Sequence, residues 1–387
     1  MLELASYLPS RHHVVVHGWP DSEGNSLRSA AVLAANLDAP VYLLCEDREK
    51  TAALLSRLVA SEPAAAQVKP VAKRTLRAIV LTATARVILF THGVFGDPKP
   101  GPHRVYVNLW HGHGPKRTAT RSFETRIPSD LLIANTRAWG SETAKAFGLP
   151  QSALANIGNP RQDALFEPPS AESLQRLGLS DSRPYVVWMP TFRGVREDLA
   201  FSWSDADGLS GDHTRSSLEA LRVIIEASAV DFRVKVHPLD RDLLDTFAAW
   251  RVTDADLVGV ELSLYSFLAG SAGLISDYSS VWVEYLTLDR PLLLFCPEID
   301  SYRDGRGFKS PSMVDIASKL ITTRTSGVSE FLAAIGRGRD WRPRARRATA
   351  QALDLAEPGR CAHRLVEAIQ AVSARKGVPV RLRKADL

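Results

Sequence analysis

Short apolar runs alternate with longer Ala-rich or amphipathic segments along the first half of the chain. The runs are rich in Val, Ile and Leu, as buried strands are, and they cover residues 13–17, 41–44, 87–90, 105–109 and 131–134. An Ala-rich segment at 27–37 and a second segment at 48–60 are typical of helices. Strands that alternate with helices indicate βαβ units and a parallel sheet.

The alternation pauses at Pro168 and Pro169 and then resumes. A helix is expected at about 218–227, together with further strands at 185–188, 232–236, 257–260, 273–275 and 292–295. We therefore predict an α/β protein with two doubly wound domains. The first is expected to span residues 1–175 and the second residues 176–330, while residues 331–387 form helices and a basic tail that pack back across both.

Composition narrows the class of protein. Hydrophobic residues make up 45% of the 387 residues and charged residues 24%, which is ordinary for a folded globular protein and argues against disorder. The formal net charge of +5 suits an anionic partner, such as a nucleotide, a phosphopolymer, a nucleic acid or a lipid headgroup. Charge alone does not choose among these partners.

Several kinds of site and segment are not expected. Cys45, Cys296 and Cys361 lie far apart, so neither a disulfide framework nor a zinc site is predicted. No carboxylate cluster indicates a metal site, and we expect no metal and no other cofactor. No apolar run is long enough to span a membrane, and the N-terminus lacks the core of a signal peptide. A soluble cytoplasmic protein is expected, with attachment to a membrane surface left open.

Polar turns follow several of the predicted strands. Each turn mixes small residues with basic or hydroxyl side chains, and they occupy residues 111–117 (HGHGPKR), 189–193 (MPTFR), 237–238 (HP) and 276–280 (SDYSS). Ligands of parallel sheets bind beyond the carboxyl ends of the strands. Close backbone N–H groups and cationic donors are what a pyrophosphate requires, so these turns are candidates for a phosphate site.

Each turn also has a structural interpretation. Asp277 and Ser279 could simply cap the helix that begins after Ser280. A neutral imidazole at His111 could accept a proton from an attacking hydroxyl, but spacing does not distinguish it from His113. His237, which follows the predicted strand at 232–236, could contact a phosphate or cap that strand.

Taken together, the turns resemble those of a known family. The CDP-glycerol:poly(glycerophosphate) glycerophosphotransferases carry WHG, G-x-PR-x-D, PTFR, K-x-HP, DYSS and R-D-x-R-G-F motifs. This chain carries them in the same order, at residues 110–112, 158–163, 190–193, 235–238, 277–280 and 303–308. Many members of the family read WHGTPLK, whereas this chain reads WHGHGPK from Trp110 to Lys116. Because these changed residues follow closely after His111, they bear on which acceptor or donor this chain uses.

The resemblance implies a GT-B fold, in which two Rossmann-like domains flank a cleft and the second domain holds most of the donor nucleotide. It implies that His111 is the catalytic base and that His237 assists at the pyrophosphate. The donor and its phosphates would be held by Arg161, Thr191, Arg193, Lys235, Asp277, Ser279, Ser280 and Glu284. The acceptor side would include Gly112, His113 and Lys116.

The implied reaction moves a polyol phosphate from a CDP-activated donor to a hydroxyl of a lipid-linked or polymer acceptor. Glycerol phosphate is the polyol phosphate that the resemblance favours. CMP would be released. The family's acceptors imply a peripheral position at the inner face of the cell membrane, through basic residues at 339–347 and 381–384. The alternatives are a GT-B sugar-nucleotide glycosyltransferase or epimerase and, more remotely, a nucleic-acid-binding protein. This chain carries no recognised nucleic-acid-binding motif, so no nucleic acid is expected.

Overall fold

The computed structural model describes residues 9–59, 62, 64–94, 99–118, 126–191, 211–235 and 245–383, except the side chains of 211–217. The chain forms two compact units. Unit 1 comprises Met1–His113, Arg121–Asp163 and Leu355–Leu387, and unit 2 comprises Gly114–Thr120 and Ala164–Asp354. Two differences from the predicted boundaries stand out. A short segment after His113 joins unit 2, and the C-terminal stretch divides between the units instead of forming a separate part.

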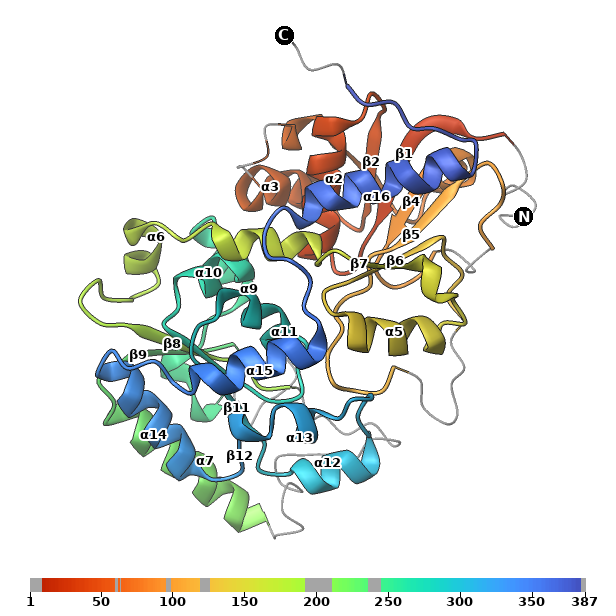
Figure 1. Ribbon diagram of the computed structural model, residues 1–387. Helices are drawn as coiled ribbons and strands as arrows, with labels where there is room; N and C mark the ends of the chain where they lie inside the picture. Colours follow the sequence, from red (N-terminus) through yellow and green to blue (C-terminus); the bar gives the residue numbers. More distant parts are fainter. Residues whose placement is uncertain are drawn as a thin grey trace. The chain divides into compact units, whose positions relative to one another are not determined.

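Unit 1 contains one parallel seven-stranded sheet in the order β3-β2-β1-β4-β5-β6-β7 (Figure 1). Its central strands are buried on both faces, which explains their continuous apolar sequences. The strands are β1 (Arg11–His17), β2 (Val41–Cys45), β3 (Lys69–Ala72), β4 (Ala85–Phe90), β5 (Val105–Asn108), β6 (Leu131–Ala134) and β7 (Leu154–Asn156).

Helices cover both faces of this sheet. On one face, α16 packs against α2 and β5, which is why the end of the chain belongs to unit 1. On the other face, Ala78, Ala144 and Phe147 of the α4 and α5 region join the core with Val15 and Ile88. The helices are α2 (Gly24–Asn36), α3 (Arg48–Leu58), α4 (Leu76–Thr84), α5 (Arg137–Ala146) and α16 (Cys361–Arg375).

Unit 2 contains a parallel five-stranded sheet in the order β12-β11-β10-β8-β9. Helices α7 and α14 lie side by side against one face of this sheet (Figure 1). Their buried side chains, which include Leu221, Ile225, Phe331 and Leu332, pack together on that face. The strands are β8 (Tyr185–Trp188), β9 (Asp231–Val234), β10 (Gly273–Ser276), β11 (Leu292–Phe295) and β12 (Ile321–Thr322). The helices are α6 (Ala171–Arg176), α7 (Gly211–Glu226), α9 (Asp254–Gly259), α10 (Leu264–Gly270), α11 (Val281–Tyr285), α12 (Ile299–Gly305), α13 (Met313–Ile316), α14 (Thr325–Gly336) and α15 (Pro343–Leu353).

One predicted strand is wrong. Residues 257–260 were expected to be extended, but they form the end of α9 and the turn after it. The cause is a capping box at the start of this helix, in which the side chains of Thr253 and Asp256 each bond the other residue's backbone N–H. This local signal outweighs the apolar run Leu257-Val258.

Strand order locates the ligand-binding edge in each unit. In unit 1 the order reverses between β1 and β4, and in unit 2 it reverses between β8 and β10. Doubly wound sheets bind ligands outside the carboxyl ends of the strands at such a switch point. Among the helices described, none is both long and apolar enough to cross a membrane.

Candidate active site

The turn after β5 carries His111 on an unusual backbone. Trp110 has a φ of 51° and Gly112 a φ of 139°, so residues with left-handed backbone flank the histidine on both sides. The backbone N–H of Trp110 donates to Oδ1 of Asn108 at 2.9 Å, which holds the start of the turn. Backbone of this kind is costly and is found most often at functional sites. It leaves the His111 side chain exposed beyond the strand end.

Two further residues of unit 1 fix this turn. Nη2 of Arg161 donates to the carbonyl oxygen of His111 at 2.9 Å, and Nη1 of Arg161 lies 3.1 Å from Oε1 of Glu23. Asn25 accepts from the backbone N–H of Arg161 at 3.1 Å and donates to the carbonyl of Trp110 at 3.4 Å. The start of α2 therefore ties the WHG turn to the turn at 158–163.

Arg161 was predicted to bind phosphate. Its guanidinium bonds a carboxylate and the backbone of the WHG turn, an arrangement that suits a positioning role. A Cβ atom at Gly24 would lie 3.0 Å from Cβ of Arg161, so the glycine permits this close approach. Contact between Arg161 and a phosphate stays a prediction.

The two histidines of the WHGHG segment differ in their surroundings. The ring of His113 is fully buried; its Nε2 donates to the carbonyl of Ile133 at 2.7 Å, and its Nδ1 lies 3.2 Å from Oγ1 of Thr143. A ring that solvent does not reach cannot meet an acceptor hydroxyl in this conformation. We therefore retain exposed His111 as the candidate base, and the acceptor-side role of His113 stays a prediction.

In unit 2, Asp277 joins the turns after β8 and β10, the two strands at the switch point. This carboxylate is 1% exposed. It accepts from the backbone N–H of Thr191 at 2.9 and 3.0 Å, from Oγ1 of Thr191 at 2.6 Å, and from the N–H of Tyr278 at 2.6 Å. Asp277 thus links the PTFR and DYSS motifs, and the N-cap of α11 is Ser280. Contact of Thr191, Asp277, Ser279 or Ser280 with a phosphate stays a prediction.

The end of the HGHGPKR turn belongs to unit 2 and pairs with the R-D-x-R-G-F segment. Lys116 and Phe308 form an antiparallel bridge, the N–H of Arg117 donates to the carbonyl of Gly307 at 3.3 Å, and the N–H of Lys309 donates to Pro115 at 2.8 Å. Arg303 of the same segment forms ion pairs with Asp300 and Asp304. The segment therefore acts as a backbone partner for the turn.

Gly114 brings this turn against the DYSS motif. A Cβ atom at Gly114 would lie 3.0 Å from both the N and the Cα of Ser280, so a side chain here would press on backbone. Ser280 is the N-cap residue of α11 but makes no side-chain capping bond, and Oγ of Ser279 accepts from the N–H of Val281 at 3.4 Å. The small residue at 114 is what allows the two motifs to touch.

The remaining predicted site residues are more scattered. Nζ of Lys235 lies 3.0 Å from the carboxylate of Asp254, and Glu284 is fully buried within α11. Arg193 and His237 lie outside the described residues. Phosphate or nucleotide contacts for all four stay predictions.

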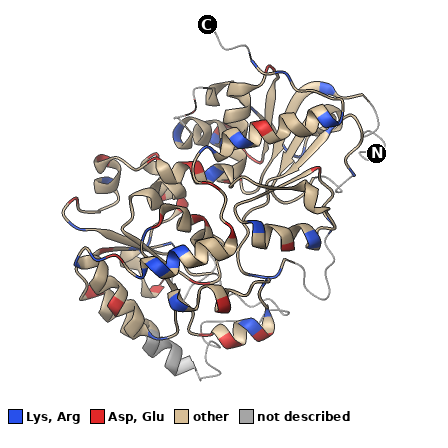
Figure 2. Cartoon of the chain, viewed as in Figure 1, with Lys and Arg blue, Asp and Glu red and all other residues tan. Residues whose placement is uncertain are grey.

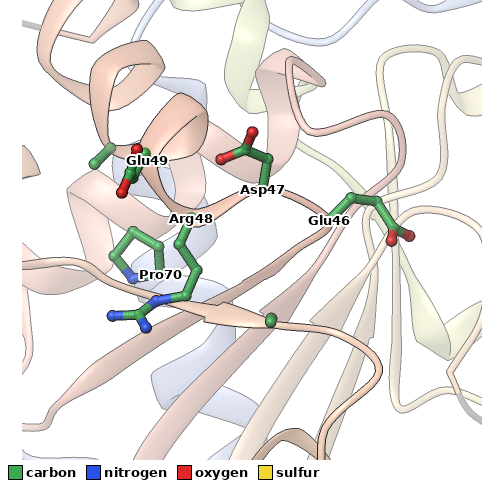
Figure 3. Close-up of a pocket in the computed structure, with 7 residues that line it drawn as sticks. Glu46, Asp47, Arg48, Glu49 and Pro70 are labelled. Carbon is green, nitrogen blue, oxygen red and sulfur yellow. The ribbon is translucent and has the colours of Figure 1, made fainter.

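A separate cavity of about 600 Å³ lies beside β2, β3 and the start of α3 (Figure 3). Glu46, Asp47 and Glu49 line it, with Arg48 as the basic residue. Asp21 accepts from the backbone N–H groups of two of these lining residues, Glu46 and Asp47. Burial raises the pKa of Asp21, but these hydrogen bonds and the Lys73 ammonium outweigh it and lower that pKa overall. The carboxylates make this cavity unsuited to an anionic nucleotide. Among the described residues, no cluster of His, Cys, Asp and Glu could hold a metal ion.

Comparisons with known proteins bear on these turns. A model of the family described as CDP-Glycerol:Poly(glycerophosphate) glycerophosphotransferase matches residues 42–371. The teichoic acid ribitol-phosphate primase of Bacillus spizizenii is 25% identical over 252 residues, which are 59% of this chain and 61% of that protein. The teichoic acid poly(glycerol phosphate) polymerase of Bacillus subtilis is 26% identical over 236 residues, 54% of this chain and 30% of that protein. The chain thus matches 30% to 61% of the length of these two relatives.

Solved structures define the fold. The wall teichoic acid polymerase TagF matches with a TM-score of 0.68 and 17% identity, over 96% of this chain and 90% of that chain. A structure of a putative UDP-N-acetylglucosamine 2-epimerase from Listeria monocytogenes matches with a TM-score of 0.55 and 13% identity, over 97% of this chain and all of that chain (100%). At these identities the likeness concerns the fold alone. With the two doubly wound sheets, it confirms the predicted GT-B class.

Proposed function

The chain belongs to the CDP-glycerol:poly(glycerophosphate) glycerophosphotransferase family, and on that basis we propose that it transfers glycerol phosphate, or a related polyol phosphate, from a CDP-activated donor to an acceptor hydroxyl. The acceptor oxygen attacks the β-phosphorus and forms a new phosphoester bond. The bond between that phosphorus and the bridging oxygen of the pyrophosphate breaks, and CMP leaves. The acceptor is a lipid-linked molecule or a polymer of cell-wall or capsule type.

The observation that carries this proposal is the construction of the His111 turn. An exposed imidazole stands at the carboxyl end of β5, its backbone held by Asn108, Arg161 and Asn25. Imidazole accepts protons near neutral pH, and a base that is fixed in place loses little entropy when the acceptor arrives. His111 would take the proton of the attacking hydroxyl.

Unit 2 would supply the donor side. Thr191 and Asp277 lock together the turns at its switch point, and Ser279 and Ser280 follow directly. Arg193, Lys235 and His237 would add cationic or hydrogen-bonding groups for the pyrophosphate, whose charge must be stabilised during transfer. Only Gly112 and His113 separate His111 from Gly114, which contacts Ser280.

Donor identity can be tested by thermal unfolding. A ligand that binds only the folded protein stabilises it by about 2.7 kcal/mol at a concentration 100 times its Kd. We expect CDP-glycerol or CDP-ribitol to raise the Tm clearly more than UDP-glucose or UDP-N-acetylglucosamine at equal concentration. Release of CMP with an acceptor present would then establish turnover. Equal or greater stabilisation by the UDP-sugars would favour a glycosyltransferase or epimerase instead.

The location of the protein is also a proposal. A cytoplasmic protein that acts on a lipid-linked acceptor needs contact with the membrane surface, and basic residues on and before α15 offer one (Figure 2). Of these, Arg346 is buried against Asp340 and Asp289, and Arg347 also pairs with Asp289. Arg337, Arg339 and Arg344 are among the exposed residues that could meet anionic headgroups.

We expect the protein to sediment with anionic vesicles but not with neutral ones, and less so as salt is raised. Each cation near an anionic surface contributes about 1 kcal/mol, so changing Arg337, Arg339 and Arg344 to Gln together should weaken binding about 10²-fold. Changing exposed Arg48, Arg57 and Arg74 of unit 1 to Gln serves as a charge-matched control. If both triple variants lose the same amount of vesicle binding, then the net charge of the protein determines that binding and this surface has no special role.

A further inference from the structure

Three ring side chains follow three neighbouring strands at the switch point of unit 1. Trp19 comes two residues after β1, His92 two residues after β4, and His111 three residues after β5. The rings of His92 and His111 are stacked, with centroids 4.4 Å apart and planes 8° apart. The indole of Trp19 meets the ring of His92 edge-on, at 5.6 Å and 84°. A continuous row of rings thus leads from Trp19 to the candidate base.

The Trp19 end of this row is exposed, and its backbone is hydrogen-bonded to the turn after β4. The indole side chain has 59% of its surface exposed. Its backbone N–H donates to Oγ1 of Thr91 at 3.3 Å, and the same oxygen lies 2.8 Å from Nδ1 of His92. The preceding Gly18 fits so closely against α2 that a Cβ atom would lie 1.9 Å from Oγ of Ser26. A single exposed apolar residue is ordinary, but one fixed in line with a candidate catalytic ring is a better candidate for a binding surface.

Burial and neighbouring positive groups act on His92, the middle ring of the row. Partial desolvation of the ring, followed by the charges of His17, Lys73 and Arg161, lowers the pKa of His92. His92 is therefore neutral near pH 7 and does not repel His111. The nearby carboxylate of Glu23 is held by Arg161 and by Ser26 and so is directed into the protein.

We propose that Trp19 and His92 form the acceptor platform of unit 1, and that its ligand is the terminal polyol or sugar unit of the acceptor. The C–H groups of such a unit would lie on the indole, and its hydroxyls would hydrogen-bond to imidazole nitrogen. The terminal hydroxyl would then be presented to His111. This proposal rests on the proposed function, because it takes His111 as the base.

The platform predicts a split between acceptor and donor parameters. With a short oligo(glycerol phosphate) bearing a free terminal hydroxyl as the acceptor, Trp19→Ala is expected to raise the acceptor KM about tenfold, a factor that corresponds to about 1.4 kcal/mol. The Kd for CDP-glycerol and the kcat at saturating acceptor should change little. Trp19→Phe keeps an aromatic face and should recover most of the loss. Leu76→Ala, at an even more exposed apolar residue of the same unit, is the control and should behave as wild type.

A second measurement separates this proposal from the proposed function. Saturation-transfer NMR with the same oligo(glycerol phosphate) reports contact with the protein whether or not turnover occurs, and the signal should weaken in Trp19→Ala and return in Trp19→Phe. Absence of transfer by the wild type together with this NMR pattern would reject the reaction but keep the platform. An acceptor KM and an NMR signal unchanged in Trp19→Ala would overturn the platform. So would a loss of CDP-glycerol affinity as large as the rise in KM.

Discussion

Replacement of His111 by alanine is expected to lower kcat by about 10²–10⁴-fold, the usual effect of losing a general base. The Kd for CDP-glycerol should stay close to that of wild type, because the imidazole acts on the acceptor hydroxyl and belongs to unit 1. Stability should change little, since the side chain is exposed and the turn is held through backbone groups. Stopped-flow or steady-state assays of CMP release measure kcat, and calorimetry measures the Kd for CDP-glycerol.

Chemical rescue gives this prediction a sharper form. Because the His111 side chain is exposed, free imidazole can enter the space left by alanine and should restore part of the activity, increasingly as pH rises and more of it is neutral. The matched variant is His113→Ala, which leaves the buried carbonyl of Ile133 without its donor. It should cost about 1–3 kcal/mol of stability, with activity following the folded fraction. A folded His111→Ala protein with near-normal turnover would refute the assignment of the base.

The central strands and the edge strand β9 could be predicted from sequence, whereas the other edge strands could not. β6 and β8 lie where the apolar runs indicated, because strands buried on both faces have continuous apolar sequences. β3 and β7, at the two edges of the first sheet, and β12, at an edge of the second, were not predicted. β3 contains Pro70 and is partly exposed, and β12 has only two residues, so none of these edges carries a strong apolar signal.

The candidate site was predictable where function is carried by one turn, and not where it depends on distant segments. His111 and Asp277 follow strands whose ends are evident in the sequence. Glu23 and Asn25 were missed because their partner Arg161 lies more than a hundred positions away along the chain. Trp19 and His92 also follow predicted strands, so the rule that ligands bind at strand ends could have identified them. Their turns carry no phosphate-binding pattern, and this is why they were passed over.

The segment that follows His113 gives the same lesson for domains. Domain boundaries were placed at breaks in the strand–helix alternation, but Gly114–Thr120 leaves unit 1 in the middle of the HGHGPKR turn. Its assignment to unit 2 depends on backbone pairing with residues near Phe308, almost two hundred positions later. Backbone hydrogen bonds use no particular side chains, so the sequence does not indicate such pairing.

Asp277→Ala is expected to have the largest effect on stability. The carboxylate is buried and serves donors on Thr191 and Tyr278, all of which would lose an acceptor. A buried donor left without an acceptor costs about 1–3 kcal/mol, and the loss of this charged acceptor should cost about 3 kcal/mol in total. For a unit of this size that corresponds to a fall in Tm of about 6–12 °C. Denaturant unfolding and calorimetry measure the two values.

The donor measurement distinguishes a functional turn from a merely structural one. If Asp277 holds the turns after β8 and β10 in the geometry that binds pyrophosphate, the folded variant should bind CDP-glycerol at least about tenfold more weakly, because the backbone N–H groups there lose their orientation. Asp277→Asn retains one oxygen acceptor but no charge, and should fall between wild type and Asp277→Ala in both stability and donor affinity. Asp300→Ala removes an exposed carboxylate of the same unit that pairs only with Arg303 in the contacts described, and both quantities should stay near wild type. If Asp277→Ala is destabilised but its folded fraction binds CDP-glycerol normally, the hydrogen bonds of Asp277 support the sheet alone. The pyrophosphate would then bind elsewhere in unit 2.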